Sequence, residues 1–258
     1  MNEKGYVGQI LEVNLTTSRM ERLPLNKKWI ELYIGGAGYA TRLLYDLIDK
    51  STNPLSPENP LIIMTGPLTG VAATSPKTAI VSRSPLTGFL GKTIGGGSFG
   101  IALKKAGYDG IVLKGKADSP TYLSIINGVP KLHSASKIWG KGTFETFNEI
   151  RSELGDEKVR VAAIGPAGEN LVKISSIITD ERRVFGRTGL GAVMGYKMVK
   201  AVAVRGSRKI EFADEKRLLE LNKRYLAAAP QTPRGGGLRA YGTGGGVVAF
   251  AQMGNLPI

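Results

Sequence analysis

Three glycine-rich segments with cationic neighbours are the parts of this chain whose residue types and spacing could do chemistry. They cover residues 65–77 (TGPLTGVAATSPK), 84–100 (SPLTGFLGKTIGGGSFG) and 180–195 (DERRVFGRTGLGAVMG), and each follows an apolar stretch. The cations within or beside them are Lys77, Arg83, Lys92, Arg182, Arg183 and Arg187. Glycine lacks the Cβ that keeps a ligand away from backbone amides, and amides combined with Arg and Lys bind phosphate. The pattern predicts a site for a large, multiply charged anion.

A purely structural role is the alternative for the same glycines. Each residue of the run Gly95–Gly97 loses more backbone entropy on folding than any other residue type would, so the run needs a reason. Tight turns and close packing supply one, and each segment taken alone favours that explanation. Three such segments with flanking cations favour a ligand.

The charge balance of the chain points to anionic partners. There are 35 Lys and Arg residues against 21 Asp and Glu residues, which gives a net charge of +14. The cations are scattered along the sequence and no nucleic-acid-binding motif is present, so nucleic acid is not the expected partner. A generally basic surface is the other explanation of the charge.

Several kinds of site are excluded by composition. The chain has no cysteine, and therefore no disulfide, thiolate-bound metal or iron–sulfur cluster of its own. Its one histidine, His133, rules out a histidine-rich metal site and is expected at the surface of a strand. A dinucleotide-binding unit is not favoured, because the run GGGSFG (95–100) does not stand in a regular βαβ unit, and the P-loop spacing G-x-x-x-x-G-K-[ST] is absent. No apolar run could span a bilayer and the N-terminus has no signal-peptide core, so we expect a cytoplasmic protein without membrane contact.

The elements that must position the glycine-rich segments alternate without a regular βαβ rhythm, which favours an α+β fold with mixed sheets. We expect strands within residues 6–15, 60–66, 77–84, 109–116, 121–128, 129–135, 159–165, 171–179 and 201–207. Helices are expected within 26–34, 39–49, 99–108, 143–155, 190–201 and 214–229, with caps at Thr143, Gly155 and Asp214. Residues 230–246, rich in glycine, are predicted to form a linker or mobile loop.

Seven collinear motifs run through the chain. They are GQILEVNLTT (8–17), PLSPENPLIIMTGPLTG (54–70), SPLTGF (84–89), AGYDGIVLKGKA (106–117), IGPAGENLVK (164–173), GRTGLGAVMGYK (186–197) and YGTGGGV (241–247). Together they resemble the N-terminal portion of the aldehyde ferredoxin oxidoreductases, which are tungsten enzymes with some molybdenum relatives. The resemblance implies that residues 1–210 form a base of two β-sheets with surrounding helices that binds a bis-pterin tungsten (or molybdenum) cofactor. Residues 211–258 are then a helix and the glycine-rich start of a following, cluster-binding region.

The resemblance also implies which residues hold that cofactor, and it implies no catalytic residue in this chain. The cofactor-binding positions are Lys77, Ile94, Gly96, Arg183, Val184, Gly186 and Arg187. Gly95–Gly97 are expected to be bare so that backbone amides approach the pterin. Three positions depart from the family pattern. Ile94 offers only its backbone where some relatives have Asn, Ala37 replaces an Arg, and Phe185 replaces a smaller residue, where it either alters the pocket or merely packs.

Two hypotheses of function arise from these motifs. In the first, the chain is the cofactor-binding part of an enzyme that oxidises aldehydes to carboxylic acids and passes electrons through a [4Fe-4S] cluster to ferredoxin. The cluster ligands would lie beyond Ile258, so this chain alone is expected to be catalytically incomplete. In the second, the chain is a free-standing pterin-cofactor-binding or carrier module that works with a separate chain. The sequence does not choose between tungsten and molybdenum, identify the aldehyde or fix the oligomeric state, and a homo-oligomer stays open.

Overall fold

The computed structural model describes residues 4–179 and 183–256, and the chain divides into two units. Unit 1 consists of Met1–Val71 and Ser75–Glu211, and unit 2 of Ala72–Thr74 and Phe212–Ile258. Among the residues described, no helix combines the length and the apolar character that crossing a membrane requires.

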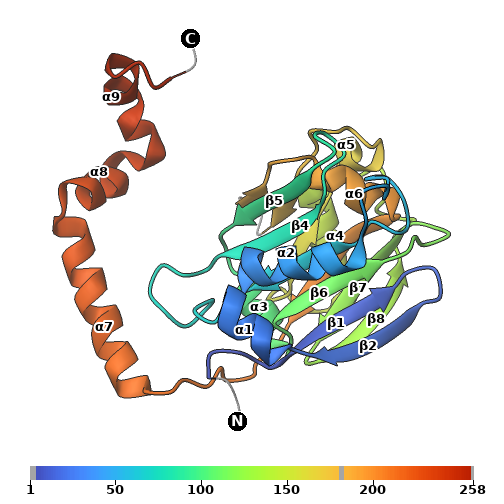
Figure 1. Cartoon of the computed structure of the whole chain (residues 1–258), viewed down its shortest axis with the longest axis horizontal. Helices are drawn as coiled ribbons and strands as arrows, with labels where there is room; N and C mark the ends of the chain where they lie inside the picture. The colour runs from blue at the N-terminus through green and yellow to red at the C-terminus, as the bar shows by residue number, and fades with distance from the viewer. Residues whose placement is uncertain (1–3, 180–182, 257–258) are drawn as a thin grey trace. The chain divides into compact units, whose positions relative to one another are not determined.

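Unit 1 is built on two six-stranded sheets. Its strands are β1 (Gln9–Asn14), β2 (Arg19–Pro24), β3 (Leu61–Thr65), β4 (Thr78–Arg83), β5 (Leu90–Gly95), β6 (Gly110–Lys114), β7 (Thr121–Ile126), β8 (Val129–Ser134), β9 (Arg160–Ala163), β10 (Ile177–Thr179), β11 (Arg183–Phe185) and β12 (Val199–Arg205). The first sheet has the order β2-β1-β6-β3-β4-β5 and the second β11-β10-β9-β12-β7-β8 (Figure 1). Both are mixed, because β1 pairs with β6 and β12 with β7 in parallel while the other neighbours are antiparallel. The predicted α+β fold of two sheets with surrounding helices is confirmed.

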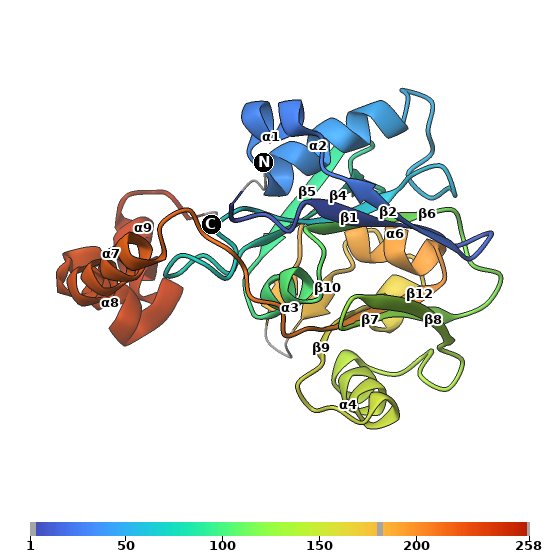
Figure 2. The same cartoon turned by 90° about the horizontal axis from the view of Figure 1, so that it is seen from below.

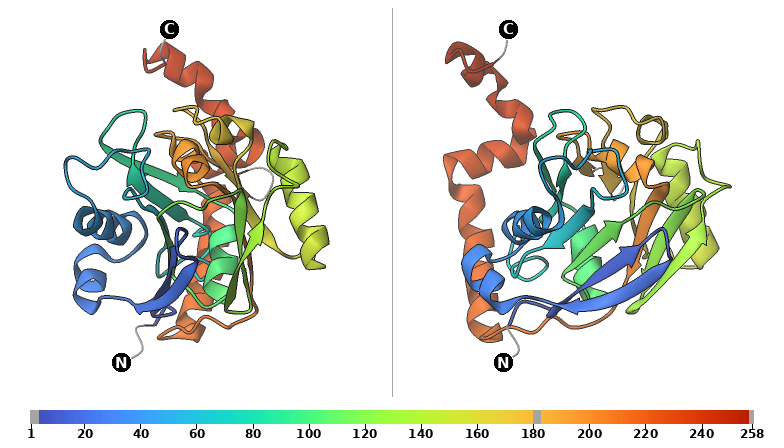
Figure 3. Two further views of the ribbon diagram at one scale, coloured as in Figure 1. Left: turned by 90° about the vertical axis from the view of Figure 1, so that its right-hand side faces the viewer. Right: turned by 45° about the vertical axis from the view of Figure 1, so that its right-hand side comes forward.

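The helices of unit 1 form layers around and between these sheets. They are α1 (Lys27–Tyr33), α2 (Gly36–Leu47), α3 (Phe99–Lys105), α4 (Thr143–Leu154), α5 (Pro166–Glu169) and α6 (Leu190–Tyr196). α1 and α2 lie on the outer side of the first sheet and α4 on the outer side of the second, whereas α3 and α6 lie between the sheets (Figure 2). Figure 3 shows the same layers from two further sides.

Burial explains why the central strands are apolar along their whole length. β3 reads LIIMT and every one of its residues is buried, because α2 covers one face of the first sheet and the second sheet with its helices covers the other. The strand β2 at the edge of the same sheet has no buried residue and carries three charges in RMERLP. A strand covered on both faces needs apolar residues throughout, whereas an edge strand exposed to water does not.

The structure corrects the predicted start of α4. Gly142, and not Thr143, is the N-cap residue. The carboxylate of Glu145 accepts a hydrogen bond from the Gly142 amide at 3.0 Å, and the hydroxyl of Thr146 donates to the Gly142 carbonyl at 2.8 Å. The predicted end is confirmed, because Gly155 adopts the left-handed conformation with φ of 64°.

Two strands of unit 1 lie in glycine-rich segments for which we predicted no strand. β5 lies inside the glycine-rich segment 84–100, and β11 begins the described part of the third segment. In β5, Gly91, Thr93 and Gly95 are buried while Leu90, Lys92 and Ile94 are exposed. This two-residue alternation is a strand signal, but glycine at two of the six positions concealed it.

Unit 2 is helical and comprises α7 (Glu215–Ala228), η1 (Ala229–Gln231), α8 (Pro233–Tyr241), η2 (Gly242–Gly246) and α9 (Val247–Gln252). The predicted Asp214 cap of α7 is confirmed, since its carboxylate accepts a hydrogen bond from the Arg217 amide at 2.9 Å. The prediction of a linker over residues 230–246 is wrong, because the Thr232 hydroxyl caps α8 by accepting from the Gly235 amide at 3.0 Å.

Candidate functional site

Edge strands from the two sheets meet in unit 1 and bring two glycine-rich segments together. β5 is an edge of the first sheet and β11 an edge of the second. The ring of Phe185 on β11 lies 2.7–2.9 Å from the position that a Cβ on Gly95 of β5 would occupy. Next to this contact, the amide of Arg187 lies 3.5 Å from the hydroxyl of Thr93. The second and third segments are therefore neighbours.

The first glycine-rich segment reaches the same place through Lys77. A Cβ on Gly96 would stand 4.0 Å from the ammonium nitrogen of Lys77. The carbonyl of Lys77 accepts a hydrogen bond from the Thr69 hydroxyl at 2.9 Å, so the turn of the first segment holds this lysine in place. All three segments thus converge at the end of β5, as the hypothesis of a shared ligand requires.

The three consecutive glycines of the run have three different environments. Gly95 faces the Phe185 ring, and the expectation that Gly95 is bare for a ligand is therefore wrong. Gly97 has φ of 101°, a conformation that residues with a side chain rarely adopt. Gly96 has neither constraint, because no atom outside its immediate neighbours lies within 3.9 Å of its Cβ position. Its backbone is left open toward the surface beside Lys77.

The surface around Gly96 combines cations with apolar side chains. Ile94 is 49% exposed and Val184 is 52% exposed. Lys77, Lys92, Arg183, Gly186 and Arg187 are exposed as well. Because β5 and β11 are edge strands, their outer backbone groups lie outside the sheet ladders and remain available to a ligand. Amide donors, cations and apolar contacts suit a flat group with negative charges attached to it.

One cation of the prediction, Arg83, does not take part in this surface. Arg83 is held by carbonyl groups: its Nε donates to Gly88 at 2.8 Å and its Nη1 to Thr52 at 2.6 Å and Lys50 at 2.9 Å. Arg83 therefore stabilises the turn at residues 84–88 and has few N–H groups left to bind an anion. Arg182 lies outside the described residues.

A hollow of about 460 Å³ adjoins β5 on the α2 side. Leu90 and Lys92 of β5 form one wall, and Tyr33, Thr41 and Tyr45 contribute to the other. Of the predicted cofactor-binding positions, Ile94 lies on β5 and Arg183 and Val184 lie on β11, and none of the seven lines this hollow.

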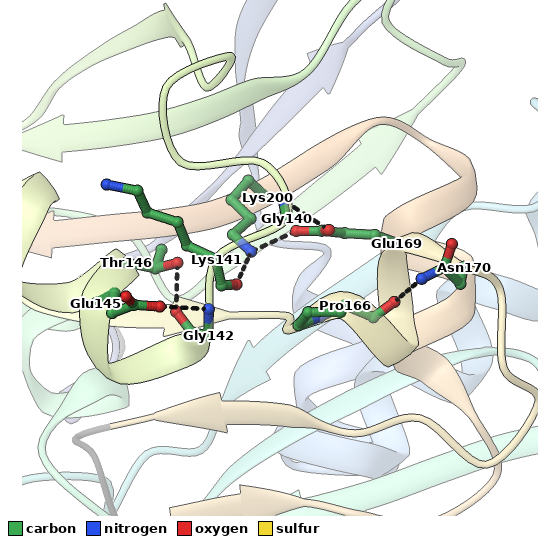
Figure 4. A network of polar contacts seen from close by, with 9 residues as sticks. All are labelled: Gly140, Lys141, Gly142, Glu145, Thr146, Pro166, Glu169, Asn170 and Lys200. Atoms are coloured by element: carbon green, nitrogen blue, oxygen red, sulfur yellow. Dashed lines mark hydrogen bonds and ion pairs between the residues drawn. The ribbon is translucent and has the colours of Figure 1, made fainter.

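A buried ion pair between Lys200 and Glu169 holds helix α5 in place (Figure 4). The Lys200 ammonium on β12 donates to the Glu169 carboxylate on α5 and to the Lys141 carbonyl at 2.7 Å. The second carboxylate oxygen of Glu169 accepts from the Gly140 amide at 2.8 Å. Burial lowers the pKa of Lys200, and the Glu169 charge opposes that shift. The two side chains are 0% and 4% exposed, so this pair fixes α5 without reaching the surface.

The position of α5 matters because α6 rests on it, and α6 begins directly after the loop that contains Gly186 and Arg187. A Cβ on Gly195 of α6 would overlap the carbonyl oxygen of Gly168 on α5, so the two helices are in backbone contact. We did not predict the Lys200–Glu169 pair. Its signal was a lone lysine in the otherwise apolar strand VKAVAV.

His133 is not the surface residue that we expected. Its side chain is 14% exposed, stacks on the Tyr122 ring with 4.5 Å between centroids, and contacts the Ser124 hydroxyl at 2.8 Å through Nε2. Burial lowers the pKa of His133. Among the described residues no cluster of three His, Asp or Glu side chains could hold a metal ion.

Comparisons with known proteins agree with this architecture. The family described as "Aldehyde ferredoxin oxidoreductase, N-terminal domain" matches residues 10–206. The tungsten-containing aldehyde ferredoxin oxidoreductases of Pyrococcus abyssi and Pyrococcus furiosus are 42% and 43% identical over 241 and 256 residues. These alignments cover 93% and 98% of this chain but 40% and 42% of the relatives, so the chain spans about two fifths of their length.

Two further matches concern proteins described as parts of assemblies. The WOR-like subunit of an aliphatic sulfonate oxidoreductase from Pyrococcus furiosus is 34% identical over 237 residues, which cover 86% of this chain and 38% of that protein. A solved structure described as the active site complex BamBC of benzoyl coenzyme A reductase, with 1,5-dienoyl-CoA, superposes with a TM-score of 0.86 at 38% identity. That match covers 88% of this chain and 35% of the other chain.

Proposed function

Since the chain belongs to the aldehyde ferredoxin oxidoreductase family through that family's N-terminal domain, we propose that unit 1 binds a pterin-based tungsten or molybdenum cofactor. The observation that carries the proposal is the open backbone of Gly96 beside Lys77, at the junction where β5 and β11 meet. Neither packing nor φ requires glycine at this position, so contact with a ligand remains as the reason for it.

Each proposed contact has a separate role. Lys77, Arg183 and Arg187 offset the negative charge of the cofactor, and the two guanidinium groups suit the paired oxygens of a phosphate. The main chain at Gly96 and Gly186 offers hydrogen-bond partners at close range. Ile94 and Val184 give apolar contact to a flat ring system. When bound, the cofactor supplies two-electron redox chemistry, and the chain positions it and tunes its electrostatics.

We propose that the chain acts as a cofactor-binding module that needs further polypeptide to form an enzyme. It spans about two fifths of its curated relatives, and it has no cysteine with which to hold a cluster. Two of its matches are described as a subunit and as a complex, which supports a role within an assembly. A partner chain, or a further part of the same protein, would complete the active site.

A second candidate is the cofactor-binding part of an aldehyde oxidoreductase, which the names of the Pyrococcus relatives favour. The reaction takes an aldehyde and water to a carboxylic acid, and releases two protons and two electrons. The electrons would leave through a [4Fe-4S] cluster in the additional polypeptide and reach ferredoxin. The net charge of +14 favours association with an acidic electron carrier.

The test is to measure cofactor retention. The chain is co-produced with its partner polypeptide in a host that makes the tungsten or molybdenum cofactor, and metal is measured by mass spectrometry and pterin by fluorescence. We expect Lys77→Ala and Arg183→Ala to lower both contents together while circular dichroism stays unchanged. The matched control is Lys137→Ala, which removes an exposed lysine from another surface. Unchanged metal and pterin in both site variants would overturn the assignment.

Activity distinguishes the module from a complete enzyme. The chain produced alone should give no aldehyde-dependent reduction of a redox dye, because the route for electrons is missing. Dye reduction by the isolated chain at the rate of the assembly would contradict the proposal that the chain needs further polypeptide, even if the assignment of the cofactor site were correct.

A further inference from the structure

A second hollow of unit 1 lies at the opposite edges of the two sheets. β2 is the edge opposite β5 in the first sheet, and β8 is the edge opposite β11 in the second. A cavity of about 380 Å³ opens between β2, the turn that joins β7 to β8, and the end of α3. It is therefore separate from the proposed cofactor site, and a ligand could occupy it whether or not a cofactor binds at β5.

Three cations from three separate segments line this cavity. Arg22 comes from β2, Lys105 from the last turn of α3, and Arg208 from the segment after β12. The guanidinium carbon of Arg208 lies 3.9 Å from the Cβ position of Gly107, and so stands against the floor of the cavity. None of the described residues that line it carries a carboxylate.

Three carbonyl groups at the cavity already have hydrogen-bond donors. The Lys105 carbonyl accepts from the Arg208 amide at 3.1 Å, and the Gly107 carbonyl accepts from the side-chain amide of Gln9 at 2.9 Å. The Gly128 carbonyl accepts from Arg22 at 3.0 Å and from the Tyr108 hydroxyl at 3.1 Å. These acceptors are therefore not available to neutralise the cations.

In contrast, N–H donors of the three cations remain without an acceptor. Arg22 uses its Nε toward the Tyr108 hydroxyl at 3.0 Å and one Nη2 hydrogen toward Gly128, which leaves three of its five N–H groups. Within the described part of the chain, the side chains of Lys105 and Arg208 have no hydrogen bond or ion pair, and both residues are exposed. A concave site with surplus cationic donors and no carboxylate favours the binding of an anion.

The neighbouring surface strengthens the positive potential. Arg208 also lines an adjoining hollow of about 370 Å³ together with Lys4, Lys27 and Lys209. The acid on that side, Glu211, is engaged with Lys4 at 2.5 Å. Clefts lined by charges of one sign concentrate their field and attract counter-ions.

We propose that the cavity of Arg22, Lys105 and Arg208 binds a small molecule through its phosphate group or groups. Two planar guanidinium groups and one ammonium match the oxygens of a phosphate or diphosphate. The cations converge into a hollow, and its volume falls within the range of roughly 300–1,000 Å³ that is usual for small-molecule sites. A flat basic face would suit a macromolecule better than this concave arrangement does.

Isothermal titration of the full chain with inorganic pyrophosphate tests the proposal, with sulfate at equal ionic strength as the reference anion. We expect saturable binding of one pyrophosphate per chain, stronger than that of sulfate. Arg208→Gln and Lys105→Gln should each weaken it about tenfold, because a charge-assisted hydrogen bond contributes on that scale. Lys137→Gln, which changes the net charge equally at another surface, should leave it unchanged.

Three results would overturn the proposal. Equal weak binding of both anions shows only a general ionic attraction. Equal losses in all three variants, Lys137→Gln included, show that net charge and not the cavity decides. A single-stranded oligonucleotide that displaces pyrophosphate with much higher affinity would assign the cavity to nucleic acid. Since Lys105 and Arg208 are exposed, their replacement should not disturb folding, and circular dichroism checks this.

Discussion

The ring of Phe185 lies 2.7 Å from the position where a Cβ on Gly95 would stand. The two residues belong to the edges of different sheets, and their contact closes the gap between β5 and β11. Phe185 is almost completely buried and belongs to the core between the sheets. Its role is therefore to pack, and the space it needs is the reason for glycine at position 95.

This contact predicts a coupled pair of substitutions. Gly95→Ala should lower the free energy of unfolding by roughly 1–3 kcal/mol, since the added methyl overlaps the ring. Phe185→Ala should cost about 3–5 kcal/mol through the cavity that it leaves. In the Phe185→Ala background the methyl of Gly95→Ala has room, so its cost should largely disappear. Urea denaturation of the four proteins measures the coupling, and an equal cost of Gly95→Ala in both backgrounds would contradict the contact.

The two following glycines should respond in opposite ways. Gly96→Ala should leave the free energy of unfolding nearly unchanged, because its Cβ position is open, but it should reduce cofactor retention by covering the backbone. Gly97→Ala should destabilise the protein by about 1–3 kcal/mol, because φ of 101° strains a residue with a side chain. Thermal unfolding together with metal content separates these effects. A loss of stability in Gly96→Ala as large as in Gly97→Ala would remove the case for an accessible backbone.

The sequence was sufficient to predict most strands of the two sheets, but not the contact between β5 and β11 that joins the sheets. Apolar runs such as LIIM and the turn residues around them predicted most strands, and the glycine-rich segments with cations predicted the place where Lys77 and Gly96 meet. The Phe185–Gly95 contact joins residues 90 positions apart on strands that do not pair, so no local pattern could reveal it. Glycine in β5 has a low strand propensity, and tertiary packing overrides that propensity here. We did not predict helix α8 because of the glycines that follow Thr232. The helix forms nevertheless, because the Thr232 hydroxyl caps its N-terminus.

The buried pair of Lys200 and Glu169 predicts strong non-additivity. Lys200→Met leaves the Glu169 carboxylate buried without its counter-charge, and the free energy of unfolding should fall by about 3–5 kcal/mol. The double variant Lys200→Met with Glu169→Gln should lose less than the sum of the single variants, because no buried charge remains. Lys141→Met and Glu149→Gln are the matched controls, since they remove an ion pair at the surface, where about 0–1 kcal/mol is expected. Additive losses at Lys200 and Glu169 would show that the pair is not coupled.

A second buried lysine, Lys197, predicts a dependence of stability on pH. Its ammonium donates to the carbonyls of Gly115 at 2.8 Å and Pro57 at 3.3 Å, and the residue is fully buried. Burial lowers the pKa of Lys197 to about 7, and Glu58 opposes the shift only in part. The unfolded chain, with its ordinary lysine pKa near 10.5, therefore binds more protons than the folded chain at any pH between about 7 and 10.5. The free energy of unfolding contributed by this group must rise with pH across that window.

The slope of this rise is the quantity to measure. One proton corresponds to at most about 1.4 kcal/mol per pH unit. Lys104, whose pKa burial lowers to about 8, adds a rise of the same sign that is largest above that value. In urea denaturation between pH 7 and 8, Lys197→Met should therefore remove a large part of the rise, while Lys137→Met should not. Loss of the ammonium also leaves the Gly115 carbonyl short of a donor, which lowers stability at every pH equally and does not affect the slope. If wild type and Lys197→Met gave parallel curves over this interval, the ammonium would not be titrating in the folded protein.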